Sequence, residues 1–291
     1  MPGNKLWRYY DLIKFLALVN GELYFARADK FKDKYEGAIP KQNFLHFAEL
    51  YYQSEIKNDT TLRNKVGNRG ETLPNDLKIH MDRVPADIRN RIRDKFLENF
   101  KERKNKVAIS CWHLNESESA AMWEVYSRAG QGIAVSTTLE KLEKLTKPYG
   151  FEMEMLKVDY IDFDKTYDKD YISHELLPFK IKRKEFEYEQ EFRIILYKKN
   201  EDFNKVKGKN SGDNSLKNSG FPDSVSELDF LPEEGISLNI NTCELIDEMI
   251  ASPEMKDYEV AEIQKILNLI NQLRGTNFTL KKSGLYENLN Y

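Results

Sequence analysis

Two glutamates, Glu189 and Glu191, stand two positions apart in the stretch EYEQEFRIILY, just before an apolar run. The alternating pattern predicts a strand, on which Glu189, Glu191 and Arg193 share one face and the two glutamates lie roughly 7 Å apart. Two carboxylates on a rigid strand suit acid–base catalysis or stabilisation of an oxocarbenium ion. The same pattern also fits a solvated strand face on which Glu191 pairs with Arg193, and both interpretations stay open.

The second group of candidates combines a cation with aromatic rings. Arg8 lies in an aromatic run near the start of the chain. It is either a cation–π or salt-bridge partner or a phosphate reader, because its planar guanidinium suits pyrophosphate. Trp112, Met122 and Trp123 are either core residues or a wall on which a nucleobase or nicotinamide ring stacks.

A metal site is the third possibility. Asp159, Asp162 and Asp164, together with Glu191, could hold Mg²⁺ in a nuclease, although their spacing is generic. The four histidines and two distant cysteines lack the spacing of a zinc site. The sequence contains no P-loop, GxGxxG, GxSxG or HExxH motif.

The composition predicts a globular protein with a sizeable core, since 40% of the 291 residues are hydrophobic and 12% are aromatic. A net charge of -3 provides no overall basic field for nucleic acid, although a local basic cleft is compatible with it. Two distant cysteines fit a reducing compartment. With no signal peptide and no apolar stretch long enough to span a membrane, we expect a cytoplasmic protein.

The elements that must position these residues begin with a strand at residues 6–10. Asp11 is a good N-cap for the helix that follows, Gly21 is a good stop, and a second strand is expected at residues 23–26. Residues 41–106 contain two charged, helix-patterned stretches around a Gly/Asn/Pro segment at 66–76. We interpret 41–106 as a helical insertion rather than an independent domain.

The middle of the chain predicts strands at 106–114 and 133–137 on either side of a helix at 118–128. Asn115 and Ser117 are candidate caps for that helix, and Thr137 with Glu140 forms a capping box for the next one. Residues 151–156 alternate like a half-exposed strand. We expect 157–162 to continue the sheet and a helix across 171–186 to lead into the glutamate strand.

The last third of the chain starts with a polar Gly/Asn/Ser/Lys-rich excursion at residues 199–220. A strand at 236–240, an apolar segment at 244–253, a long helix at 258–275 and a strand at 278–283 follow. The whole chain, 1–291, is thus predicted to be a single mixed α+β domain with a helical insertion at 41–106 and a flexible loop region at 199–230.

Five sequence blocks together resemble the bacterial family known as domain of unknown function 2971 (DUF2971). They span residues 6–37, 109–135, 158–162, 179–195 and 244–253. In the turn FKDKYEG, Lys32 and Lys34 stand where Asn and Pro are usual in the family. The family's MWxxY and ExExR patterns correspond here to Met122, Trp123 and Tyr126 and to Glu189, Glu191 and Arg193.

More distantly, the strand–helix–Gly–strand start and the late ExE strand are similar to the ADP-ribosyltransferase superfamily. This resemblance implies a largely antiparallel sheet core of that type, with NAD as substrate. There is no first-strand His, and a Ser-Thr-Ser element is matched only loosely at 136–138. The implied contacts with the NAD ribose, phosphate and nicotinamide come from Arg8, Tyr9, Tyr24, Phe25, Trp123 and Tyr126. Glu191 would stabilise the oxocarbenium ion, with Glu189 as its orienting partner.

We therefore expect an NAD-using ADP-ribosyltransferase-like protein, a toxin or phage-defence effector that modifies a protein or nucleic acid acceptor. Cleaving the nicotinamide–ribose bond develops positive charge on the sugar, which a fixed carboxylate stabilises without reorganising. The alternatives are a non-catalytic binding module on the same fold and a metal-dependent nuclease using Asp159, Asp162 and Asp164. The surroundings of Glu191 discriminate: Arg8 and aromatic rings across a cleft favour the enzyme, whereas burial against Arg193 without a cleft favours the module.

Overall fold

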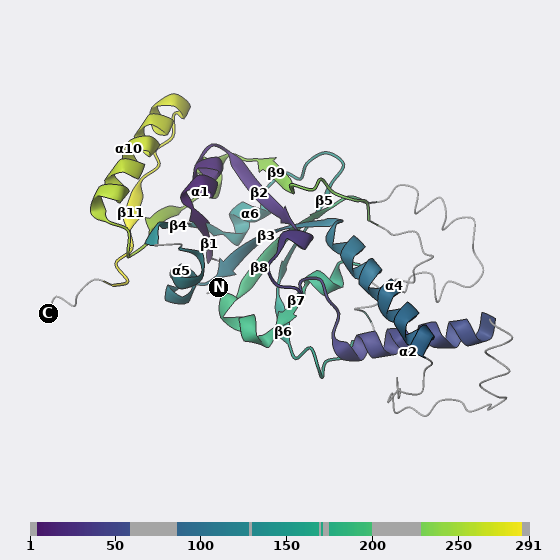
Figure 1. Cartoon of the computed structure of the whole chain (residues 1–291). Coiled ribbons are helices and arrows are strands. Elements are labelled where there is room, and N and C mark those ends of the chain that lie inside the picture. Colours follow the sequence, from purple (N-terminus) through teal and green to yellow (C-terminus); the bar gives the residue numbers. More distant parts are fainter. Residues whose placement is uncertain are drawn as a thin grey trace.

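A nine-stranded, largely antiparallel open sheet forms the centre of the chain (Figure 1). The computed structural model describes residues 5–58, 86–127, 130–168, 170, 175–199 and 228–286. Only β10 and β11 pair in parallel within this sheet. Its strands are β1 Lys5–Asp11, β2 Glu22–Arg27, β3 Val107–Leu114, β4 Gly132–Thr138, β5 Glu152–Lys157, β8 Glu191–Tyr197, β9 Ile236–Asn239, β10 Glu248–Ala251 and β11 Leu280–Lys282. The predicted α+β class is confirmed.

The sheet divides in two along one edge of β3. The opposite edge of β3 pairs with β8 over its length, from Val107 to His113. On the divided edge β2 pairs only with residues 108–109, and β1 pairs only with residues 113–114. Residues 110–112 therefore have no ladder partner on this edge among the described strands. We call this gap the fork; it separates the branch β1-β4-β10-β11 from the branch β2-β9.

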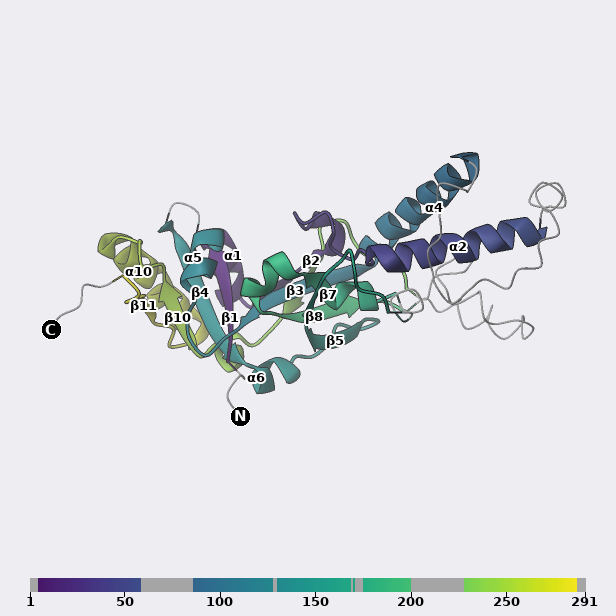
Figure 2. The same ribbon diagram turned by 90° about the horizontal axis from the view of Figure 1, so that it is seen from below.

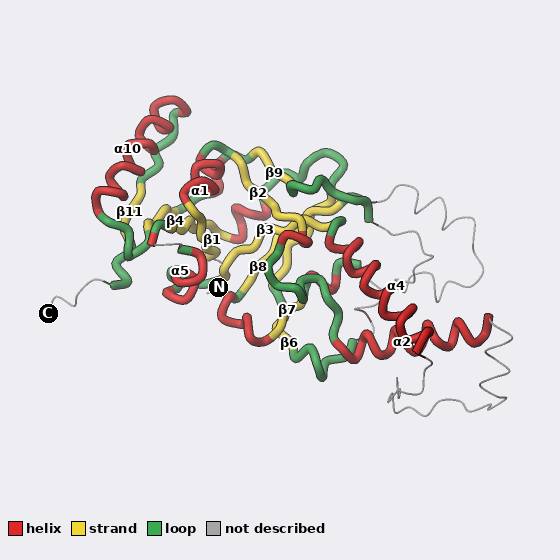
Figure 3. Tube along the Cα trace, in the orientation of Figure 1, coloured by secondary structure: helices red, strands yellow, loops and turns green. Residues whose placement is uncertain are grey.

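Helices surround the sheet, and two of them form an arm (Figure 3). The arm consists of α2 and α4, which pack on each other and project away from the strands in both Figure 1 and Figure 2. No helix among the described residues is both long and apolar enough to cross a membrane. The helices are α1 Leu12–Val19, α2 Lys41–Asn58, α4 Ala86–Lys104, α5 Ala120–Tyr126, α6 Leu139–Glu143, α9 Thr242–Leu245 and α10 Asp257–Arg274, with 3-10 turns η1 Ala28–Lys30, η4 Leu177–Phe179 and η5 Lys184–Glu189.

The two faces of the sheet have different roles. On one, which we call the core face, Leu6, Trp112 and Phe192 belong to the largest hydrophobic cluster. On the other, the site face, Trp7, His113 and Glu191 lie directly opposite one another across β1, β3 and β8. Because side chains alternate along a strand, these registers fix which residues can meet on each face.

The start of the chain folds as its local signals predict. The Asp11 side chain accepts a hydrogen bond of 2.9 Å from the Lys14 amide, as an N-cap does. Gly21 has a φ of +96°, a conformation that favours glycine, and it turns the chain from α1 into β2.

Two other predicted caps are wrong by one or more positions. Ser119, not Asn115 or Ser117, caps α5 and accepts from the Met122 amide. Likewise Thr138 caps α6, while Thr137 is buried and donates to the carbonyl of Leu245. Before α6 the strand β4 runs one residue further than expected, to Thr138, and the cap shifts with it; β3 ends at Leu114 as expected, and α5 simply begins later.

The segment before β8 differs most from the prediction. Residues 157–162 continue the main sheet only at Lys157, the last residue of β5, because β6 (Asp159–Ile161) pairs in parallel with β7 (Ile181–Arg183) in a separate two-stranded sheet. The described part of the predicted helix at 171–186 is η4, β7 and the start of η5 instead. Pro178 disfavours a continuous α-helix there, and Ile181 and Lys182 are both buried. The segment at 66–76 and most of 199–230 lie outside the described residues.

Candidate acid–base site

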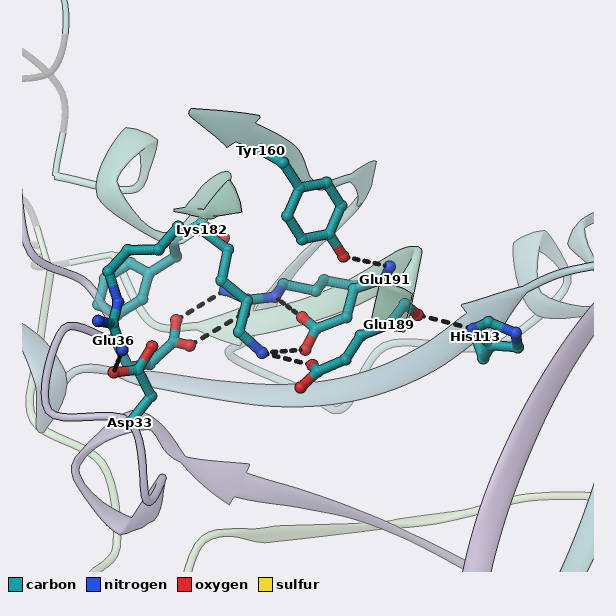
Figure 4. A network of polar contacts seen from close by, with 10 residues as sticks. Asp33, Glu36, His113, Tyr160, Lys182, Glu189 and Glu191 are labelled. Atoms are coloured by element: carbon teal, nitrogen blue, oxygen red, sulfur yellow. Dashed lines mark hydrogen bonds and ion pairs between the residues drawn. The ribbon is translucent and has the colours of Figure 1, made fainter. Parts of the chain in front are cut away.

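Lys182 brings the two glutamates together (Figure 4). Its ammonium donates to Glu191 Oε1 at 2.7 Å and to Glu189 Oε2 at still shorter range. All three side chains are at least nine-tenths buried. The glutamates therefore meet in the fold, but not as neighbours on one strand: Glu189 ends η5 and Glu191 begins β8.

Arg193 links this pair to a distant turn. Its Nε donates to Glu191 Oε2 at 2.6 Å, as the predicted strand pairing requires. Its two terminal nitrogens donate to Glu36 at 2.7 and 2.9 Å, and the Arg193 side chain is fully buried. We call Glu36, Arg193, Glu191, Lys182 and Glu189 the charge network. With every group ionised, three carboxylates face two cations and one negative charge is left over.

That surplus charge decides where a proton resides. Burial, followed by a hydrogen bond shared with Glu191, raises the pKa of Glu189 to about 7. Burial alone would raise the pKa of Glu191 as well, but Arg193, the bond with Glu189 and the Lys182 ammonium together hold it well below its usual range. Glu189 is therefore the carboxyl that exchanges a proton near neutral pH, and Glu191 stays ionised.

The backbone around the pair is fixed on both sides of Gln190. Gln190 has a φ of 37°, in the left-handed region, and it turns the chain from η5 into β8. The Glu191 amide donates to the Tyr160 hydroxyl at 2.8 Å. His113 Nδ1 lies 2.7 Å from the Glu189 carbonyl. Since a carbonyl can only accept, Nδ1 carries the hydrogen, and burial lowers the pKa of this neutral ring.

Aromatic side chains from β1 and α5 lie on the same face as the pair. Tyr9 stacks with Tyr126 at 6.4 Å between ring centroids and meets Trp123 edge-on at 4.8 Å. Burial, followed by the charge on Glu189, raises the pKa of Tyr126. Its phenol is thus protonated beside the carboxylates, while 42% of the residue remains exposed. Two of the predicted NAD contacts, Tyr9 and Tyr126, therefore lie at the site, whereas Trp123 is 2% exposed and packs with Tyr9 in a small hydrophobic cluster.

Arg8, by contrast, does not face Glu191. It neighbours Trp7 on β1, so alternation sends its side chain to the core face, where it lies 5.1 Å from the Tyr10 ring. There it donates to Ser110 Oγ at 2.5 Å and to the Tyr24 carbonyl at 3.0 Å. The predicted arrangement of Arg8 and Glu191 across one cleft is therefore wrong, and Arg8 braces the fork from behind.

Neither of the two stacking candidates on β2 makes a described contact with Glu189 or Glu191. Phe25 has no exposed surface and packs in the main core, so a ligand cannot stack on it in this conformation. The Tyr24 hydroxyl donates to the Glu234 carbonyl near the start of β9. A role for either residue in NAD binding stays a prediction that their described contacts do not support.

The aspartates of the nuclease alternative do not converge. Asp162 accepts bonds from the Asp164 and Lys165 amides, as a turn-forming aspartate does. Asp164 is 82% exposed. Within the part of the chain that the structure describes, no three histidine, cysteine or acidic side chains are grouped to hold a metal ion. Burial raises the pKa of Cys111, which keeps its thiol protonated and poorly nucleophilic.

Sequence reasoning missed three members of the site, Lys182, Glu36 and Tyr160. Lys182 lies in the stretch predicted as a helix, and its burial depends on the β7 strand that forms there instead. Glu36 had a usable signal, because it lies in the turn FKDKYEG of the family resemblance. Tyr160 contributes a single hydroxyl from a short strand, for which the sequence holds no signal.

Comparison with known proteins identifies one family. A model of a family described as protein of unknown function (DUF2971) matches residues 122–194, a stretch that contains most of α5, Lys182 and both glutamates. No curated protein and no solved structure matches the chain. Over residues 122–194 the chain therefore carries the sequence pattern of this family, which confirms the resemblance drawn from its motifs.

Proposed function

We propose that the site face carries out NAD-dependent ADP-ribosyl transfer, with Glu189 rather than Glu191 as the residue that takes part in the chemistry. The observation that carries the proposal is the Lys182-linked glutamate pair, in which one carboxyl exchanges its proton near neutral pH beside Tyr126. Such a carboxyl suits acid–base work at physiological pH.

Glu189 is proposed in place of Glu191 because the two carboxylates have different contacts. Glu191 is already neutralised by two cations, Lys182 and Arg193, so little of its charge is available to a developing oxocarbenium ion. Among the described residues, Glu189 forms an ion pair with one cation, Lys182. In the proposed step the nicotinamide–ribose bond breaks and its electron pair leaves with nicotinamide. The acceptor then bonds to the ribose carbon and gives its proton to ionised Glu189.

The fork offers a place for the nicotinamide. The Leu114 amide donates to the carbonyl of Gln190, just before β8. By alternation along β3, the N–H and C=O of Cys111 point the other way, into the fork. A carboxamide presents one donor and one acceptor, which complements this pair. Tyr9 and Tyr126 flank the fork on the site face, and we propose that they contact the ring.

The test is release of nicotinamide from labelled NAD by purified protein, with protein, RNA and DNA offered as acceptors. We expect wild type and Glu187→Gln, an exposed neighbour, to release nicotinamide, and Glu189→Gln to lose at least about 100-fold in rate. Equal release by Glu189→Gln, or none by wild type with any acceptor, overturns the proposal. A role as toxin or phage-defence effector rests on the resemblance alone, and comparing cells that express wild type or Glu189→Gln tests it.

A non-catalytic binding module is the second candidate. Burial of Glu191 against Arg193 favours it, because a carboxylate that is fully paired inside the fold can have a purely structural role. This candidate predicts that NAD or another nucleotide raises the melting temperature of wild type and of Glu189→Gln equally, without turnover. A shift confined to wild type contradicts it.

A further inference from the structure

The turn between η1 and α2 is locked against the segment that carries Lys182. Glu36 lies in this turn and is 3% exposed. At the next position Gly37 has a φ of +73°, and an added Cβ would lie 2.6 Å from the Phe179 ring. The backbone therefore packs directly on η4, which leaves the Glu36 carboxylate little freedom to move.

We propose that Glu36 is a positioning residue that, through Arg193 and Glu191, sets the protonation of Glu189. The inference rests on the proposed function in one respect, namely that Glu189 is the residue that acts. Glu36 itself touches neither Glu189 nor Lys182; its contacts in the network are the two bonds to Arg193.

The argument depends on how Arg193 divides its charge. Its two terminal nitrogens face Glu36 and its Nε faces Glu191. Without the Glu36 charge, the network keeps two carboxylates, Glu189 and Glu191, and two cations, Lys182 and Arg193. It therefore no longer carries a surplus negative charge. Arg193 then neutralises Glu191 more fully, and Lys182 is left to balance Glu189. The ionised form of Glu189 gains, so its proton is lost at lower pH.

The other groups around Glu189 do not compensate for this change. Lys182 reaches it from β7, Glu191 from β8 and Tyr188 from its own 3-10 turn. Tyr126 of α5 and Tyr160 of β6 also face it, and burial raises the pKa of each phenol, so both stay neutral. The neutral His113 ring of β3 contacts the Glu189 carbonyl through Nδ1 and the Asn115 side-chain amide through Nε2. Lys182 is thus the one cation in direct contact with Glu189 among the described residues.

The experiment compares Glu36→Gln with a control from the same turn, Asp33→Asn. Asp33 pairs with Arg183 at 3.2 Å and is not part of the charge network. The Glu189 carboxyl is followed by ¹³C NMR during a pH titration and assigned by its absence in Glu189→Gln. We expect the midpoint to fall by about one pH unit in Glu36→Gln and to stay unchanged in Asp33→Asn. Equal midpoints in the two variants overturn the inference.

If Glu36→Gln does not fold, the conservative variant Glu36→Asp takes its place. Glu36→Asp keeps the charge but withdraws the carboxylate from Arg193, so its midpoint should lie below that of Asp33→Asn; equality again overturns the inference. Nicotinamide release measured across pH separates the two proposals. If the Glu189 midpoint shifts in Glu36→Gln but the wild type does not cleave NAD, the proposed function is rejected and the positioning role of Glu36 stands. If NAD is cleaved, but replacing Glu36 changes neither the Glu189 midpoint nor the pH dependence of nicotinamide release, only the positioning role is rejected.

Discussion

At the scale of single residues, Lys182 determines whether the site exists. Burial by itself would lower the pKa of this ammonium, but Glu191 and Glu189 outweigh it and raise the pKa well above the usual range. The lysine is therefore charged wherever the protein is folded, and the two carboxylates can lie together only because it is.

Replacing Lys182 with Met should consequently lower the free energy of unfolding by about 3–5 kcal/mol at pH 7, since it leaves buried carboxylates without their cation. The loss should shrink at pH 5, where protons can take the place of the ammonium. Urea unfolding at both pH values measures this, with the exposed Lys184→Met as the matched control. An identical loss at both pH values would contradict the electrostatic explanation.

Glu189 should leave its own signature on stability. Its pKa of about 7 in the fold exceeds the ordinary value of 4.5, so between these values the folded chain holds a proton that the unfolded chain has released. Stability contributed by this group is complete below pH 4.5 and is lost as the pH rises towards 7. The slope reaches at most about 1.4 kcal/mol per pH unit. Glu189→Gln should remove this slope and Glu187→Gln should retain it; matching slopes in both variants would refute the raised pKa.

At the scale of elements, local signals predicted what local contacts determine. The cap at Asp11, the stop at Gly21 and the alternation of β8 beyond Glu191 depend on neighbours in sequence, and β1, α1, β2 and β8 were found where expected. Residues 175–189 were not, because their conformation depends on contacts made far along the chain. The pairing of Glu191 with Arg193 was predictable from an i, i+2 spacing, whereas Glu36 lies 157 residues from Arg193.

Gln190 is the element-scale feature most open to mutation. It is the one non-glycine residue with a positive φ among the described residues. Gln190→Val should cost about 1–2 kcal/mol of unfolding free energy, because a branched side chain tolerates this conformation poorly. Gln190→Gly should be neutral or slightly stabilising. Chemical denaturation ranks the variants, and a Val variant as stable as the Gly variant would show that the turn relaxes.

At the scale of the whole molecule, the arm has a small core of its own. Ala48, Tyr51, Ile88 and Ile92 form a hydrophobic cluster separate from the two clusters on β3 and β8. Ile92→Ala should therefore lower protection from hydrogen exchange in α2 and α4 by about 2–5 kcal/mol and leave β8 unchanged. Comparable loss in β8 would show that arm and sheet unfold together.

Arg8 gives the fork a property that matters for any ligand. β1 and β2 diverge at this point, and the arginine ties β2 to β3 from behind while its own strand continues into the other branch. The position of β2 relative to β3 at the fork is thus fixed by hydrogen bonds within the protein. A ligand that binds at the fork from the site face would contact residues that are already ordered in the free protein. Binding there should need little conformational change in the protein, and so should cost little conformational entropy.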